Sequence, residues 1–301
     1  MLPVQAALLL ALASPATQAL PGAQVPAAGD PVEIEDVLVT GRPLREMIEN
    51  FVDEVAEPPR GRGPARWDRK VCVGVVNLRR EPAQVMIDRV SRVALDIGLE
   101  IGEPGCSPNI LVLATHDAVG LATALIETRP NAFRPNYAGA ARSAAALERF
   151  RTTDDPVRWW HVAIPIDSDT GVPAVRMPGE APPRLATLGG LLRTEFRNDL
   201  RRAFVIVDID RAVGVNFQQL SDYVAMVAFA QIDPEADLTP YPTVLNLFQA
   251  PSAVDSLTDW DRSYLTALYD AELNQKNPDS QSGAVSGAMV RDREQAPPAR
   301  E

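Results

Sequence analysis

The sequence predicts an α+β or α/β protein in which helices pack on a mixed sheet. One observation is a strand–helix–strand pattern over residues 71–77, 82–98 and 109–114, which is typical of a parallel βαβ unit. Another is the series of apolar runs and helical patterns that continues to about residue 270. A chain of 301 residues with 46% hydrophobic content is also long enough to bury a substantial core.

The charge balance excludes several classes of function. The chain has 29 Lys and Arg against 40 Asp and Glu, a net charge of −11, which argues against extended contact with nucleic acid. Two Cys and two His cannot form a four-thiolate zinc site. There is no P-loop, no Gly-x-Gly-x-x-Gly motif and no Gly-x-Ser-x-Gly elbow. We therefore expect no cofactor.

The first residues predict export. Residues 1–29 carry no charged side chain, and an apolar run over 6–13 is followed by a small-residue site ending at Ala19. This layout indicates a secretory signal peptide, residues 1–19, and hence a periplasmic or secreted protein; a disordered leader is the alternative. No run approaches the ~20 apolar residues needed to cross a bilayer, so we expect no stable membrane insertion.

The two cysteines are expected to pair if the protein is exported. In an oxidising compartment a disulfide between Cys72 and Cys106 is favoured. The predicted βαβ unit places both residues near the N-terminal ends of neighbouring parallel strands. Two separate buried thiols are the alternative. No His lies beside either Cys in the sequence, which argues against catalytic thiols.

The segment 20–64 is expected to precede a single domain over 65–273. It contains an alternating strand at 32–41, a helix at 43–55 and a Pro- and Arg-rich linker at 58–64. The strand resembles the short N-terminal box by which outer-membrane receptors engage an energising partner, and it equally resembles an ordinary edge strand. It leaves open a structural role in a larger envelope assembly.

The remaining elements follow from the same periodicities. Asn216 is the predicted N-cap of one helix, and Thr258 or Asp259 that of the last. Beyond Asn274 the chain is polar, and residues 274–301 are predicted to be disordered. The expected helices are 118–128, 138–150, 184–200, 217–231 and 259–269, and the expected strands are 157–164 and 202–208.

Residues 65–270 resemble an uncharacterised family of secreted proteobacterial proteins with a zincin-like, metallopeptidase-type core. The resemblance rests on a strand at 204–208, a helix at 217–232 and the segment 243–248. It also rests on Leu257-Thr258-Asp259-Trp260-Asp261, Ala267-Leu268-Tyr269, Ala65-Arg66-Trp67 and Pro108-Asn109-Ile110. It implies a degenerate zincin-like core.

The zinc-ligand positions of such a core are replaced. A zincin helix carries two His at positions i and i+4, with a catalytic Glu beside the first and a third ligand after the helix. That spacing puts Asp222 and Met226 at the His positions, Tyr223 at the Glu position and Ile232 at the third ligand. Only Asp222 could bind zinc, and Tyr223 cannot replace the base. The resemblance therefore implies a pseudoenzyme that binds an envelope protein or a cell-wall component.

The alternative function is an envelope hydrolase, metal-dependent or acid–base, that uses His116, His161 and Asp222. His116 follows a predicted strand at its carboxyl end, where open α/β sheets place ligand-binding groups, and Asp117 stands next to it. The structural interpretation places His116 and Asp117 at a helix start and makes His161 one aromatic residue among others at a sheet edge.

Adjacent tryptophans suggest a stacking platform for a sugar or a peptide. Trp159 and Trp160 occupy neighbouring positions of a predicted strand. Because side chains alternate between the two faces of a strand, we expect one to be in the core and the other exposed.

An acidic stretch, 233–237, lacks the Gly and closing Glu of an EF-hand loop and indicates a solvated turn.

Overall fold

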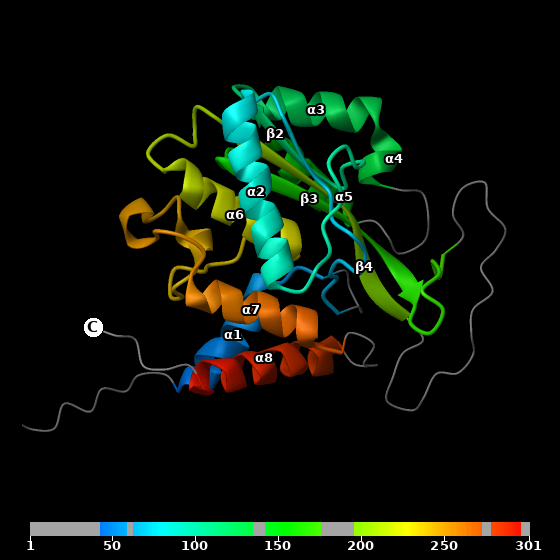
Figure 1. Ribbon diagram of the computed structural model, residues 1–301, viewed down its shortest axis with the longest axis vertical. Helices are drawn as coiled ribbons and strands as arrows, with labels where there is room; N and C mark the ends of the chain where they lie inside the picture. Colours follow the sequence, from blue (N-terminus) through cyan, green and yellow to red (C-terminus); the bar gives the residue numbers. More distant parts are fainter. Residues whose placement is uncertain (1–42, 59–62, 135–141, 176–195, 273–277, 296–301) are drawn as a thin grey trace, which may run out of the picture. The chain divides into compact units, whose positions relative to one another are not determined.

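A computed structural model describes residues 43–58, 63–134, 142–175, 196–272 and 278–295 (Figure 1). Within these ranges a four-stranded sheet has the order β1-β2-β4-β3. Strands β1 (Val73–Val76), β2 (Ile110–Thr115) and β4 (Phe196–Asp208) are parallel, and the edge strand β3 (Val157–Asp167) is antiparallel to β4. The predicted mixed sheet with packed helices is confirmed.

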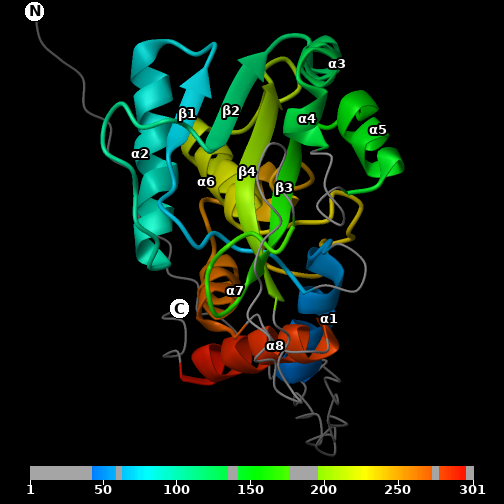
Figure 2. The ribbon, with the colours of Figure 1, turned by 90° about the vertical axis from the view of Figure 1, so that its right-hand side faces the viewer.

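Helices cover both faces of the sheet. Helices α2 (Arg80–Asp96) and α6 (Phe217–Phe229) pack on one face, where most of the apolar core lies. The short helices α3 (Ala118–Thr128), α4 (Pro130–Phe133) and α5 (Ala144–Thr152) cover the other face with a second, smaller core (Figure 2). Strand β3 is therefore buried along its whole length although it lies at the edge.

A third group of helices packs at the end of the sheet. Helices α1 (Leu44–Val55), α7 (Asp259–Asp270) and α8 (Pro278–Gln295) lie together there (Figure 1). Phe51 of α1 makes edge contacts with the rings of Trp260 and Tyr264 on α7. Two short 3₁₀ turns, Val244–Asn246 and Pro251–Ala253, connect α6 to this group. No helix in the described ranges is both long and apolar enough to span a bilayer.

Two predictions about secondary structure are wrong. Residues 196–200 belong to β4 and not to a helix, because they pair with the second half of β3 from Ala163 to Asp167; residues 184–195 lie outside the described ranges. Residues 278–295 form α8 instead of a disordered tail. Its apolar residues Val285, Met289 and Val290 are buried, and its Gly, Ala and Ser residues present little bulk to α1 and α7.

The N-terminal boundary also differs from the sequence prediction. Helix α1 contributes Ile48, Phe51 and Val55 to the main core, so residues 43–58 belong to the same unit as the sheet. The leader at 1–19 and the strand at 32–41 lie outside the described residues. The predicted helices at 43–55, 82–98 and 118–128 are confirmed to within two residues at each end.

The predicted disulfide is present. Cys72 and Cys106 are bonded, with their Cα atoms 6.1 Å apart. The bridge joins the residue before β1 to the loop that leads into β2. Asn109 holds the same junction, because its side-chain oxygen accepts the N–H of Cys72 and its amide donates to the carbonyl of Lys70.

Loss of this disulfide is expected to lower the free energy of unfolding by about 3–4 kcal/mol, because the bridge closes a loop across a sequence separation of 34 residues. Urea unfolding of the oxidised chain, of the reduced chain and of a Cys72→Ala/Cys106→Ala double variant measures the effect. The double variant is the control for the reductant, since its stability should not change on reduction. Equal stability of the oxidised and reduced chains would contradict this account.

Candidate functional site

Helix α6, which carries the predicted zincin positions, lies at the centre of the fold. Every residue from Gln219 to Phe229 is buried. The predicted cap Asn216 is confirmed, since its side chain accepts the N–H of Gln219 and the Gln219 side chain accepts the N–H of Asn216. A helix buried on all sides has no solvent to satisfy its polar groups, so each must find a partner within the protein.

Asp222 is held by an arginine that the sequence did not single out. Its carboxylate is fully buried and accepts two hydrogen bonds from the Arg89 guanidinium, the Nη2 one at 2.9 Å. It also accepts the backbone N–H of Leu257 at 3.0 Å. Such a bidentate pair has strong, specific geometry. Asp222 therefore joins α6 to α2 and to the loop before α7, and both of its oxygens are in use.

His161 has a structural partner as well. It is buried on β3, and its Nε2 lies 2.7 Å from the carbonyl oxygen of Val227 on α6. Since a carbonyl only accepts, Nε2 carries the proton. Burial and then the positive charge of Arg142 lower the pKa of His161 to about 3, against the opposite effect of the Val227 bond. The imidazole is neutral at neutral pH.

The last turn of α6 is capped by ring donors from three other segments. The carbonyls of residues 227–229 accept, in order, from His161 Nε2, Trp67 Nε1 and the Tyr269 hydroxyl, at 2.7, 2.9 and 2.9 Å. The last carbonyls of any helix lack partners within the helix. These aromatic residues supply those partners in the absence of water, so His161 acts here as a cap.

The Leu-Thr-Asp-Trp-Asp motif is also structural. Thr258 is the N-cap of α7, in agreement with one of the two predicted caps, and its side chain accepts the N–H of Asp261. The fully buried Asp261 carboxylate accepts from the N–H groups of Val244 and Thr258 and from the hydroxyls of Thr243 and Thr258. The motif thus fastens the segment after α6 to the start of α7.

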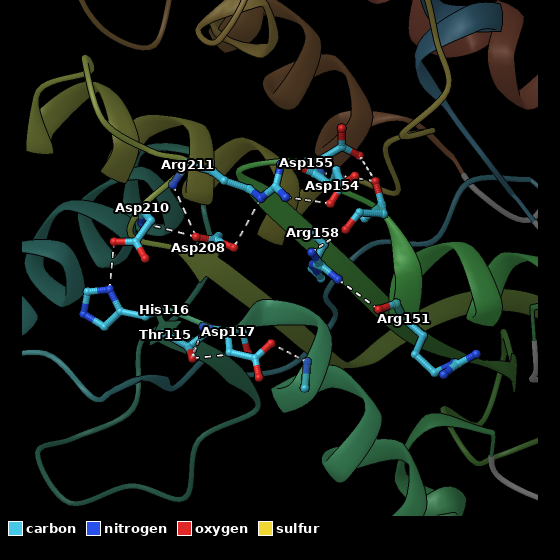
Figure 3. Close-up of polar contacts among 12 residues, drawn as sticks. Thr115, His116, Asp117, Arg151, Asp154, Asp155, Arg158, Asp208, Asp210 and Arg211 are labelled. Atoms are coloured by element: carbon cyan, nitrogen blue, oxygen red, sulfur yellow. Dashed lines mark hydrogen bonds and ion pairs between the residues drawn. The ribbon is translucent and has the colours of Figure 1, made fainter.

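His116 lies at the carboxyl ends of β2 and β4, as the sheet rule predicts. Its Nδ1 is 2.9 Å from Oδ1 of Asp210, and both side chains are exposed (Figure 3). Asp208, at the end of β4, is buried and accepts the N–H groups of Asp210 and Arg211. Asp117 caps α3 by accepting the N–H of Gly120. The pair of His116 and Asp210 therefore stands exposed on the surface.

The structure does not bring His116, His161 and Asp222 together. In the sheet register, His161 pairs with Ala203, which pairs with Ile110, six residues before His116. At about 3.3 Å per residue the two histidines are separated by roughly 20 Å along the strands. The two histidines therefore cannot bind the same metal ion or act on the same bond of a substrate. No group of three or more His, Cys, Asp or Glu within the described ranges is arranged to bind a metal.

The expectation of one exposed tryptophan is wrong. Trp159 and Trp160 are both buried, because helices cover both faces of β3. The indole N–H of Trp159 donates to the carbonyl of Ile232 at 3.0 Å, and that of Trp160 donates to the carbonyl of Phe133 at 2.8 Å. The two rings therefore do not form an exposed stacking platform, although Trp159 lines a cavity.

Two neighbouring cavities open beside the N-terminal half of β3, and they share Asp155, Val157, Trp159 and Pro234 as lining residues. The smaller, of about 120 Å³, is lined by aromatic side chains that include Tyr223. Burial raises the pKa of the Tyr223 hydroxyl, so this residue stays protonated and cannot serve as a base at neutral pH.

The larger cavity, which we call the arginine cavity, has a volume of about 210 Å³. Three of its lining residues are Arg142, Arg149 and Arg158. Arg158 donates to backbone carbonyls at the end of α5, including that of Arg151 at 3.0 Å (Figure 3). Burial and the nearby charge of Arg149 lower the pKa of Arg142 to about 10. Arg142 remains charged at neutral pH.

The described residues form an α/β protein with a four-stranded mixed sheet, in which helix α6 is buried from Gln219 to Phe229. No family model, curated protein or solved structure matches the chain.

Sequence reasoning missed the arginines that matter most. Arg89 lies three residues after Met86 and four before Val93, both buried on the inner face of α2. The sequence could have indicated a buried ion pair here, because Arg89 is a charged residue within the apolar stripe of α2. Arg142 and Arg158 gave no such signal, because only the packing of α5 against β3 brings them together.

Replacing Arg89 with Met is expected to cost about 3 kcal/mol of folding free energy, because the buried Asp222 carboxylate then loses its compensating charge. Arg92→Met is the matched control, since Arg92 is an exposed residue of the same helix, and it should change stability by less than about 0.5 kcal/mol. Chemical denaturation of both variants measures the difference. Equal effects would show that the Arg89–Asp222 pair is not a structural link.

The neutral, buried His161 should make the protein less stable in acid. Its pKa of about 3 in the folded state is below the ordinary value of 6.5, so the unfolded chain binds the proton first. The stability that it contributes is complete above pH 6.5 and is lost as the pH falls toward 3, at up to roughly 1.4 kcal/mol per pH unit.

Urea unfolding at several pH values between 7 and 4 tests this dependence. A His161→Phe variant should show a shallower loss of stability with acid than the unmodified chain, although it is less stable at pH 7. His116→Phe, at the exposed histidine, should retain the full slope. Identical slopes for the unmodified chain and His161→Phe would rule out His161 as the source.

Proposed function

We propose that this chain is an exported, non-catalytic binding protein of the bacterial envelope, built on a degenerate metallopeptidase-like scaffold. The observation that carries the proposal is the environment of Asp222. It is the one residue at the zincin ligand positions of α6 that could bind zinc, and its carboxylate is already occupied by Arg89 and the N–H of Leu257.

The other zincin positions support the same interpretation. Met226 and Ile232 are buried apolar residues. Tyr223 makes edge contacts with the rings of Phe248 and Trp159, at centroid distances of 5.1 and 6.2 Å. A tyrosine packed against two other rings therefore stands where a peptidase needs a carboxylate base.

Export is supported by the disulfide between Cys72 and Cys106, since such bonds persist mainly in oxidising compartments. The cavities beside β3 are the binding face in this proposal, because they are concave and combine apolar walls with charged groups. The partner is an envelope protein or a cell-wall component.

The full chain is expected to retain far less than one zinc ion per molecule after incubation with zinc and desalting, and to hydrolyse none of a broad panel of peptide and ester substrates. Metal analysis and activity assays measure both. Retention of about one zinc per chain, lost on replacing His116 or His161 with Ala, would overturn the proposal and favour the hydrolase.

The binding face can be located with a photo-crosslinking residue placed at Thr152, an exposed residue of the arginine cavity. Val85, which is 55% exposed on α2, is the matched position away from the cavities. In cells that export the chain, covalent adducts with envelope material are expected from position 152 and not from position 85. Equal adduct formation at the two positions would place the binding face elsewhere.

A further inference from the structure

The arginine cavity contains a buried positive charge without an acidic partner. The side chain of Arg158 is 2% exposed. Its terminal nitrogens donate to the carbonyls of Phe150, Arg151 and Thr153, and its Nε has no hydrogen-bond partner. No carboxylate of the described residues lies within ion-pairing distance of this guanidinium. A buried charge satisfied only by carbonyls favours the approach of an anion.

Two more arginines at the cavity have unused donors. Arg142 has a side chain that is 8% exposed, lies over the ring of Trp160 and pairs with Glu57. Arg149 pairs with Glu57 and Glu235. The Nε of each arginine lacks a hydrogen-bond partner. Each of these nitrogens is a buried donor without a partner on a residue that lines the cavity.

The charges at the cavity favour a ligand with a single negative charge. Glu57 and Glu235 compensate two of the three guanidinium groups through the ion pairs of Arg142 and Arg149. Asp155 stands at the exposed rim, where its carboxylate accepts from the Thr153 hydroxyl and is screened by solvent. The buried guanidinium of Arg158 has no ion pair among the described residues, and the carboxylates of Asp208, Asp155 and Asp154 act on it only from beyond ion-pairing distance.

The apolar lining of the arginine cavity fits a ligand whose uncharged part is apolar. Ala146, Phe150, Val157 and Trp159 line the cavity with apolar surface. A guanidinium presents its Nε–H and Nη–H donors in a fork that matches the two oxygens of a carboxylate. We infer that the arginine cavity binds a carboxylate group carried on a short apolar or aromatic body. This inference rests on the proposed binding function and names the chemical class of its ligand.

The carboxylate can belong to a free small acid or to the C-terminus of a peptide. Isothermal titration of the full chain with 3-phenylpropionate tests the first source, and titration with N-acetyl-Ala-Phe tests the second; the primary amide of each is the uncharged control. We expect saturable binding of at least one acid, with its amide bound at least about tenfold more weakly, since hydrogen bonds to a charged group have that order of effect.

Variants of the cavity connect the binding to the arginines. Arg142→Gln and, independently, Arg149→Gln are expected to weaken binding of the acid by about tenfold or more. Arg151→Gln is the control, because Arg151 is on the same helix as Arg149 and pairs with Glu148. The affinity of this variant for the acid should be within about twofold of that of the unmodified chain. Circular dichroism establishes that each variant is folded, and Arg149→Gln decides the outcome if Arg142→Gln does not fold.

The inference is overturned if neither acid binds up to about 10 mM, if an amide binds as well as its acid, or if the folded cavity variants bind as tightly as the unmodified chain. In that case adducts from position 152 would still support the binding function with another ligand class. Stoichiometric zinc and hydrolysis, by contrast, would overturn the binding function itself.

Discussion

The burial of α6 from Gln219 to Phe229 is the constraint on which the rest of this fold depends. It removes a carboxylate and the carbonyls of the last turn from solvent, so each of these groups costs free energy if it is left without a partner. The neighbouring segments supply what is missing: Arg89 from α2 for Asp222, and His161, Trp67 and Tyr269 for the carbonyls. The sheet and the neighbouring helices are therefore fixed around α6 by directed bonds as well as by apolar contact.

This constraint explains why the residues that suggest chemistry in the sequence have structural roles in the fold. Histidine, tryptophan and tyrosine each combine a large apolar ring with one hydrogen-bond donor, which is what a buried helix end requires. His161 and Trp67 both serve in this way, on Val227 and Ala228. A buried aspartate with a bidentate arginine is likewise a stable link between two helices. The same residue types would form a metal site only if their free atoms converged.

Sequence reasoning was most successful where the controlling interactions are local. The βαβ unit, the cap at Asn216 and the disulfide all depend on periodicity or on residues close to one another in the chain. It failed where distant partners decide the structure. Residues 196–200 are a strand because the second half of β3 pairs with them, and α8 is a helix because α1 and α7 bury its few apolar residues. The Arg89–Asp222 pair, across 133 positions of sequence, has the same origin.

The buried polar groups of the described residues differ in whether they have hydrogen-bond partners. On α6 the side chains of Gln219, Ser221 and Asp222 are all hydrogen-bonded, so a ligand there would have to displace internal bonds. Unpartnered atoms occur on α7, at Trp260 and Ser263, and at the edge of β3. At the edge of β3 the Nε atoms of Arg142, Arg149 and Arg158 are buried without partners beside an open cavity. A protein tolerates uncompensated polar groups at a cost in stability, and such groups persist where another molecule completes them. The centre of this protein therefore stabilises the fold, and its edge carries the binding face that we propose.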